Sequence, residues 1–265
     1  MLSKVFTFWK KKEKPKVTWW STIDGLEKVV PIVPAKDYIP DWWKRVERMI
    51  ENIESKGSVK NCPSFPEYIT QGFVVPLWCD LHVNIEHEKF EWHSPEKMFS
   101  FTSHSDEQFR NWAPKHVKDN TSMVLKPNCP WRVKTPPGWS VWQLPMYYDF
   151  NPTFEVLPGI IWSDMHHEIN QQMLIKKYGE FIIPRGTPLA MYVPYERQKY
   201  DYDIQGPTPE NASWTNESYI HIRSKFKGGY KLHQAEIKKC PFPHEAKKTI
   251  DSTKKTKRKP RKKKI

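Results

Sequence analysis

The sequence lacks a long apolar segment and a Gly-rich phosphate-binding loop. No run of about eighteen apolar residues occurs in the chain, so we expect no membrane-spanning helix of the usual kind. The absence of a Gly-rich loop argues against ATP or GTP hydrolysis of the usual kind. The opening residues MLSKVFTFWKKK have a short apolar run with the charges on its wrong side, so we expect no secretory signal.

Cysteine is also scarce, with four residues among 265 and no close pair. This argues against a disulfide framework and a zinc site of the usual spacing, and we expect reduced thiols. Cys62, Cys129 and Cys240 each precede a proline, which favours an extended backbone and a structural role. Neither these residues nor Cys79 lies in a Cys/His arrangement that would indicate a nucleophile.

Positive charge is abundant but concentrated at the two ends of the chain. The net charge is +13, and residues 246–265 hold eleven Lys or Arg against one Asp. Residues 1–16 hold six Lys against one Glu, which leaves residues 17–245 at about −2. We therefore expect a basic N-terminal arm over 1–16 and a disordered Lys/Arg-rich tail over 236–265.

The C-terminal tail predicts a polyanionic partner. A flexible segment with this charge binds nucleic acid with little sequence preference, and its affinity falls steeply with salt. The alternative is a solvated tail without a specific partner. The residues expected to contact nucleic acid are Lys254, Lys255, Lys257, Arg258, Lys259, Arg261, Lys262, Lys263 and Lys264.

Short apolar runs rich in β-branched residues predict a mainly β domain over 17–235. Three such runs are Phe154–Ile161, Gly179–Pro184 and Pro188–Pro194, and a tight turn at Gly186 joins the last two. Strands this short with turns this frequent indicate a jelly-roll or β-clip-like sandwich or barrel.

Further strands are expected earlier and later in the chain. The segment Gly72–Glu86 reads as two strands with a break at Pro76, and Lys97–Ser103 as another strand. A strand and a turn at Asp24-Gly25 fit the segment from Val17 to Ala35. The alternating segment Ser218–Arg223 fits either an edge strand or a helix.

One packed amphipathic helix is predicted over Asp41–Lys56, because its apolar residues recur at helical spacing. Asp41 is a suitable N-cap and Gly57 a suitable stop. We expect the helix to pack against a sheet, with partner binding as the alternative. Its apolar face comprises Trp42, Trp43, Val46, Met49, Ile50 and Ile53.

The sharpest cluster of chemically active side chains is Asp164, His166, His167 and Glu168, on an expected turn between two strands. We consider Asp164, His166 and His167 candidate ligand-binding residues. A non-haem iron site needs two His and one carboxylate, which Asp164, His166 and His221 would supply. The usual order of ligands is reversed here, and the alternative is a solvated polar turn.

Three segments together resemble a family of uncharacterised proteins from tailed bacteriophages, marine ones especially, and from some bacteria. They are NCPWRVKTPPGWS at 128–140, LPGII at 157–161 and IPRGTPLA at 183–190, followed by Pro194. The resemblance covers about residues 20–200 and implies a phage or phage-like origin, in the host cytoplasm or the virion. The family has no assigned activity, so no catalytic residue is implied.

A second, weaker similarity involves Pro158–Met165 (PGIIWSDM) and Gly186–Met191 (GTPLAM). These segments are similar to two motifs of the dUTPase and dCTP-deaminase family, which implies a β-clip fold and a trimer. In that family an aspartate activates water and a tyrosine stacks on the sugar. Trp162 and Met165 stand at those positions here, so the resemblance implies that hydrolysis by that mechanism is lost.

The sequence thus predicts a non-enzymatic phage binding or assembly protein that needs no cofactor. Nucleic acid is its expected partner through the tails, a homotrimer is one expected assembly, and no membrane contact is expected. One alternative is a jelly-roll iron-dependent oxygenase. The other is a degenerate dUTPase-like protein that binds a nucleotide.

Overall fold

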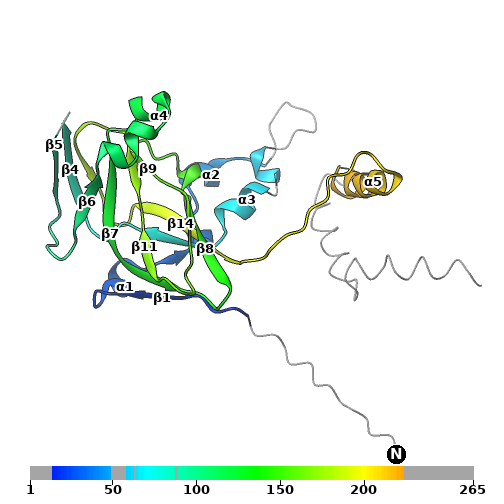
Figure 1. Cartoon of the computed structure of the whole chain (residues 1–265), viewed down its shortest axis with the longest axis horizontal. Helices are drawn as coiled ribbons and strands as arrows, with labels where there is room; N and C mark the ends of the chain where they lie inside the picture. Colours follow the sequence, from blue (N-terminus) through cyan, green and yellow to red (C-terminus); the bar gives the residue numbers. More distant parts are fainter. Residues whose placement is uncertain (1–13, 49–57, 63, 87–88, 224–265) are drawn as a thin grey trace, which may run out of the picture. The chain divides into compact units, whose positions relative to one another are not determined.

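The computed structural model describes residues 14–48, 58–62, 64–86 and 89–223 (Figure 1). The chain divides into two compact units, residues 1–199 and 200–265. The strands of the described ranges all lie in the first unit, and they form three antiparallel sheets. The predicted mainly β character is therefore confirmed.

Two of the sheets are large and the third is small. The six-stranded sheet contains β1 (Thr18–Ser21), β6 (Phe101–His104), β7 (Met123–Lys134), β9 (Phe154–Val156), β11 (Glu168–Asn170) and β12 (Met173–Ile175). The five-stranded sheet has the order β10 (Gly159–Ile161), β8 (Trp139–Pro145), β14 (Pro188–Glu196), β3 (Phe73–Pro76) and β2 (Val33–Pro34). The small sheet has the order β13 (Gly179–Ile183), β4 (Leu81–Glu86) and β5 (Lys89–His93).

The helices of the described ranges are mostly single turns. The α-helices are α1 (Leu26–Val29), α2 (Asp41–Arg45), α3 (Ser64–Ile69), α4 (Lys115–Asp119) and α5 (Pro209–Arg223). The 3-10 turns are η1 (Ala35–Asp37), η2 (Val59–Asn61), η3 (Asp106–Gln108), η4 (Arg110–Trp112) and η5 (Tyr147–Asp149). No helix in these ranges is long and apolar enough to cross a membrane.

Two sequence-based expectations change at the helices. The helix expected over Asp41–Lys56 begins at Asp41, but α2 ends at Arg45 because Val46 takes an extended backbone conformation. Residues 49–57 lie outside the described part of the chain. For Ser218–Arg223 the helical alternative is confirmed, since this segment forms the end of α5 rather than an edge strand.

Strand β7 organises the six-stranded sheet because it changes partners along its length. It pairs with β1, β6, β11 and β12, all antiparallel. Its prolines, which cannot donate to a ladder, lie at the end of a partner strand or at an irregularity of the pairing. Pro127 faces Phe101, the first residue of β6, and Pro130 lies just past the end of β1, where the register between β7 and β11 shifts. The sequence pattern did not predict β7 because these prolines interrupt the strand signal.

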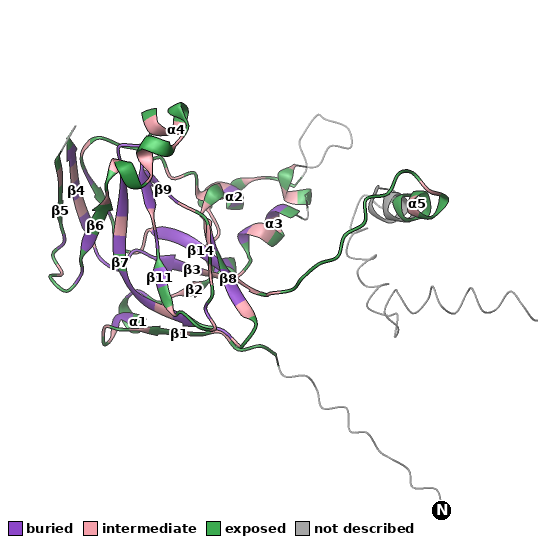
Figure 2. Cartoon of the chain, viewed as in Figure 1, coloured by how far each residue is buried: buried purple, intermediate pink, exposed green. Residues whose placement is uncertain are grey.

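One hydrophobic core is shared by all three sheets. Strands β7, β14 and β3 are largely buried (Figure 2). The core cluster includes Leu125, Trp131 and Val133 of the six-stranded sheet, Val75, Val141 and Tyr192 of the five-stranded sheet, and Leu81, Val83 and Phe181 of the small sheet. A separate aromatic cluster anchors α2 and α3, where Trp43 stacks on Phe65 at 4.4 Å between ring centroids.

A close backbone approach at the start of β3 requires glycine. Gly72 has φ +67°, and a Cβ at this position would lie 2.1 Å from the carbonyl oxygen of Tyr192 in β14. Gly25 has a similar φ of +79°, but a Cβ there would meet open space. The two glycines therefore separate the cost of a left-handed backbone from the cost of a steric clash.

We expect Gly72→Ala to be much more destabilising than Gly25→Ala. The left-handed conformation alone costs a residue with a Cβ roughly 1–2 kcal/mol, and only Gly72 adds a backbone clash inside the sheet. Urea unfolding of both variants measures the difference. Equal losses in the two variants would contradict the close approach of Gly72 to the backbone of β14.

Candidate functional site

The predicted polar cluster lies between β10 and β11. Strand β10 pairs with β8 of the five-stranded sheet, and β11 pairs with β7 of the six-stranded sheet. The expected turn between two strands is confirmed, and it connects the two large sheets. Asp164, His166 and His167 lie on this turn, and Glu168 begins β11.

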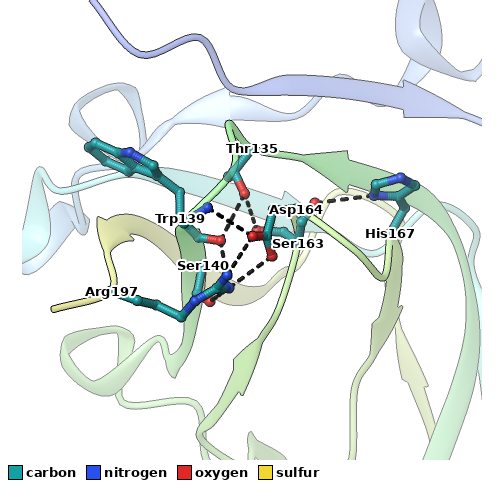
Figure 3. A network of polar contacts seen from close by, with 8 residues as sticks. Thr135, Trp139, Ser140, Ser163, Asp164, His167 and Arg197 are labelled. Carbon is teal, nitrogen blue, oxygen red and sulfur yellow. Dashed lines mark hydrogen bonds and ion pairs between the residues drawn. The ribbon is translucent and has the colours of Figure 1, made fainter. Parts of the chain in front are cut away.

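Asp164 is held by a bidentate ion pair with Arg197, which follows the end of β14 (Figure 3). One guanidinium nitrogen donates to Oδ1 at 2.8 Å and the other to Oδ2. The backbone N–H of Gly138 donates to Oδ2 at 2.9 Å. The Asp164 side chain is only 7% exposed, so these donors replace its water.

Arg197 also joins the β7–β8 turn to the end of β14. Its guanidinium donates to the carbonyl of Trp139 at 3.0 Å and to the hydroxyl of Ser140 at 2.8 Å. Its backbone N–H donates to the carbonyl of Gly138 at 2.8 Å. One arginine therefore fixes three segments: the β7–β8 turn, the β10–β11 turn and the end of β14.

Two further polar contacts fix the β10–β11 turn. The hydroxyls of Thr135 and Ser163 share a buried hydrogen bond of 2.7 Å, which Figure 3 shows beside the ion pair. The Nδ1 atom of His167 lies 3.2 Å from the carbonyl of Val133 and 3.1 Å from that of Ser163. Since carbonyl oxygens only accept, Nδ1 carries a proton that it donates to one or both. His167 is thus part of the support of the turn.

The ion pair shifts the pKa of both partners. Chiefly because Arg197 donates hydrogen bonds to it, the pKa of the Asp164 carboxyl falls from 3.8 to about 2. The same hydrogen bonds raise the pKa of Arg197 above its ordinary value. Asp164 therefore remains ionised at neutral pH, and its oxygens are occupied by donors from the protein.

His166 and Glu168 face a different environment from Asp164. Both are exposed and line a groove of about 390 Å³ along β10, together with Trp162, Asn170 and Gln172. Glu168 is 56% exposed and forms a long ion pair of 3.5 Å with Arg132. The structure therefore places Asp164 and His167 in the support of the turn and His166 in the groove.

The residues of the iron hypothesis are not seen together. In the ranges that the structure describes, no three His, Cys, Asp or Glu side chains come together as a metal site. His221 belongs to α5 in the second unit, and its side chain lies outside the described part of the chain. That His221 forms a metal site with Asp164 and His166 therefore stays a prediction.

Exposed apolar side chains gather on the outer face of the five-stranded sheet. In the register, Ile160 of β10 is paired with Trp142 of β8, and these side chains are 46% and 42% exposed. The rings of Trp142 and Tyr195 lie 5.4 Å apart, and Trp162 just beyond β10 is 54% exposed. We call these four residues the aromatic platform: Trp142, Ile160, Trp162 and Tyr195.

Arg197 connects the ion pair to the aromatic platform. Its guanidinium carbon lies 4.9 Å from the centroid of the Trp162 ring, in cation–π geometry. The ion pair with Asp164 fixes the guanidinium, and the guanidinium in turn contacts the ring of Trp162. Neither Arg197 nor the aromatic platform was identified from the sequence.

The buried cysteines are unsuited to nucleophilic chemistry. Burial raises the pKa of the Cys79 thiol to about 11 and that of Cys129 to about 12, so neither forms a thiolate at neutral pH. Cys62 is exposed, and these three cysteines are all free thiols. Cys240 lies outside the described residues.

A second pocket, of about 260 Å³, lies between η5 and β9. Its lining includes Tyr147 and Phe150, which are 60% and 61% exposed. Phe150 has φ 51°, an unusual left-handed conformation for an aromatic residue. Among the described residues that line it, the charged side chains are Lys176 and Glu155, and they form an ion pair with each other. No uncommitted charge among these residues therefore marks this pocket for a ligand.

No protein-family model matches the chain, and no curated protein shows significant sequence similarity to it. The tail residues from Lys254 to Lys264 that are expected to bind nucleic acid lie outside the described part of the chain. A functional assignment must therefore rest on the residues of the first unit and on the charge of the sequence.

Replacing Asp164 tests the ion pair through pH. The folded-state pKa lies below the unfolded one, so the pair stabilises the fold above about pH 4 and the contribution is lost as pH falls through about 2. Near neutral pH we expect Asp164→Asn to lose about 1–3 kcal/mol, as for a hydrogen bond to a charged group. The difference from the natural chain should shrink towards about pH 2.

The matched control is Asp119→Asn, which removes an exposed ion pair with Lys115 within α4. An exposed pair of this kind contributes only about a few tenths of a kcal/mol. Denaturant unfolding at several pH values compares the two variants. A pH-independent difference for Asp164→Asn would show that its carboxylate does not act as a charged acceptor.

Proposed function

We propose that this chain is a non-enzymatic binding or assembly protein. The observation that carries the proposal is the aromatic platform, a set of large exposed or half-buried side chains on one sheet. Soluble domains rarely expose such groups together unless they contact a ligand or a partner. The arginine that fixes Trp162 is itself fixed by Asp164, so the surface is organised before any ligand binds.

The state of the reactive groups supports a binding role over catalysis. Asp164 is occupied by Arg197 and by the N–H of Gly138, and His167 faces backbone carbonyls. Cys79 and Cys129 are buried thiols with a raised pKa. A general base must be free to accept a proton from a substrate, and these groups are engaged in holding the fold.

The fold, origin and location belong to the same proposal. Three antiparallel sheets around one core are compatible with a jelly-roll or β-clip-like sandwich. We propose a phage or phage-like origin, with the protein in the host cytoplasm or the virion, on the basis of the motif resemblance. A trimer is the assembly that the β-clip similarity suggests.

The basic ends supply a second mode of binding. With a nearly neutral middle and eleven positive charges in residues 246–265, the chain is suited to contact nucleic acid through its tail. Such contacts involve phosphates and carry no sequence preference. In this proposal the tail contacts nucleic acid while the aromatic platform contacts a different partner.

A gel-shift titration with duplex and single-stranded DNA tests the tail. We expect the full chain to shift both DNAs, with affinity falling roughly 10³-fold or more between about 50 and 200 mM salt. A chain ending at Glu245 should lose this binding. A full-length variant with Gln at the nine tail positions from Lys254 to Lys264 controls for chain length.

Retention of the shift in both tail variants would contradict the tail proposal. If neither the full chain nor the variants shift DNA, the tail is a solvated end without this partner. Neither outcome tests ligand binding at the aromatic platform, for which a separate experiment is described below.

The alternatives from the sequence have direct tests. Metal analysis of the full chain addresses the iron hypothesis: a stoichiometric metal that His166→Ala removes and the exposed control His116→Ala keeps would support it over our proposal. Saturable thermal protection by a deoxynucleotide would support the degenerate dUTPase-like alternative. We expect no metal, because the oxygens of Asp164 are occupied. We expect no protection by a deoxynucleotide, because none of the described residues that line the groove at Trp162 is a Lys or Arg that could hold its phosphates.

A further inference from the structure

We propose that the aromatic platform and the adjoining groove bind a neutral carbohydrate chain. This inference rests on the proposed binding function and names the ligand class of that surface. Sugar rings present apolar C–H faces and a rim of hydroxyl groups. A protein site for them therefore needs flat exposed aromatic faces next to uncharged hydrogen-bonding side chains.

The sheet aligns the aromatic faces. Side chains alternate along a strand, so Ile160 and Trp162 point to the side opposite Ile161, which packs on the core. Trp142 is paired with Ile160 in the register and has Tyr195 of β14 beside it at 5.4 Å. The aromatic platform thus extends over three neighbouring strands of one sheet.

Trp162 is held in place without being covered. Arg197 lies over its ring at 4.9 Å, yet 54% of the residue remains exposed and the ring lines the groove. An aromatic side chain that is already ordered loses little conformational entropy when a ligand stacks on it. Figure 3 shows how the ion pair that orders Arg197 is built from Asp164 and the β7–β8 turn.

The groove adds uncommitted polar groups beside the tryptophan. His166, Asn170 and Gln172 line it, and within the described ranges their side chains make no hydrogen bond to the protein. Amide side chains offer both donors and acceptors, as hydroxyl groups do. The groove volume of about 390 Å³ lies within the range of small-ligand sites, roughly 300–1,000 Å³.

The charge of the site favours a neutral ligand. Among the residues that the structure describes, no Lys or Arg lines the groove. Arg197 is paired with Asp164, and Arg132 is paired with Glu168. An anion such as phosphate would find no uncommitted cation there. The chemistry therefore differs from that of the tail, which suits polyanions.

Two other ligands, an added peptide strand and a second copy of the chain, fit the aromatic platform and the groove less well. Strand β10 is an edge strand of only three residues, so it offers an added peptide strand few backbone hydrogen bonds. A second copy of the chain would cover the apolar side chains but would leave the amide groups of Asn170 and Gln172 without a role.

Affinity electrophoresis of the full chain in gels with a neutral polysaccharide tests the inference. Dextran, galactomannan and hydroxyethylcellulose serve as probes, at a salt concentration that suppresses the tails. We expect retardation by at least one of them, with the apparent affinity reduced at least tenfold in Trp162→Ala and in Asn170→Ala. Trp112→Ala, at a site 83% exposed and outside the aromatic platform, should bind like the natural chain.

Asn170→Ala shows that a loss of binding is not caused by misfolding. The Asn170 side chain is exposed and makes no hydrogen bond within the described part of the chain, so its removal should leave the fold unchanged. No retardation by any probe, or unchanged retardation in both Trp162→Ala and Asn170→Ala, overturns the inference. So does a concentration-dependent dimer, seen by sedimentation, that Trp162→Ala abolishes. If the full chain shifts DNA but no polysaccharide retards it, only the carbohydrate inference is overturned and the proposed binding function stands. If it binds neither DNA nor polysaccharide, the proposed binding function is overturned as well.

Discussion

The ion pair between Asp164 and Arg197 is the interaction on which the candidate binding surface depends. A carboxylate that is only 7% exposed requires donors in place of water, and Arg197 and the N–H of Gly138 supply them. Because the same guanidinium lies over Trp162, the electrostatics of the turn determine the position of an aromatic side chain. The ion pair and the candidate binding surface are therefore coupled. Weakening the Asp164–Arg197 pair would make the Trp162 side chain more mobile even if the sheet stays folded.

In our proposal, the division of charge along the chain provides two modes of binding with different physics. The tail would act through many phosphate contacts, which salt screens. The aromatic platform would act through apolar and aromatic contact, which salt leaves largely unchanged. Residues 17–245 are close to neutral, so they would neither assist nor oppose the tail by charge. In the proposal the two ligands would bind independently, and salt concentration would separate their contributions.

The parts of the fold that local signals determine were predictable from the sequence. The turn with Gly186 at φ +85° joins β13 to β14 as expected, because glycine and proline specify it locally. Strand β7 was not predictable in this way, since whether a proline is tolerated depends on where distant partner strands end. The helix expected over Asp41–Lys56 was too long for a related reason: Trp42 and Trp43 belong to a helix of only five residues, and they pack in an aromatic cluster with Phe65.

In the candidate site, too, contacts between residues that are distant in the sequence could not be predicted. Asp164 was recognisable as an unusual group, but its partner is 33 residues away and only the pairing of β14 with β8 brings it near. The aromatic platform was hidden by treating Phe154–Ile161 as one strand. An unbroken strand would turn Ile160 to the same face as Phe154 and Val156, which are buried. The break at Leu157-Pro158 instead sends β10 to the other large sheet, where Ile160 faces solvent beside Trp142. A two-residue interruption thus converts a core position into part of the aromatic platform.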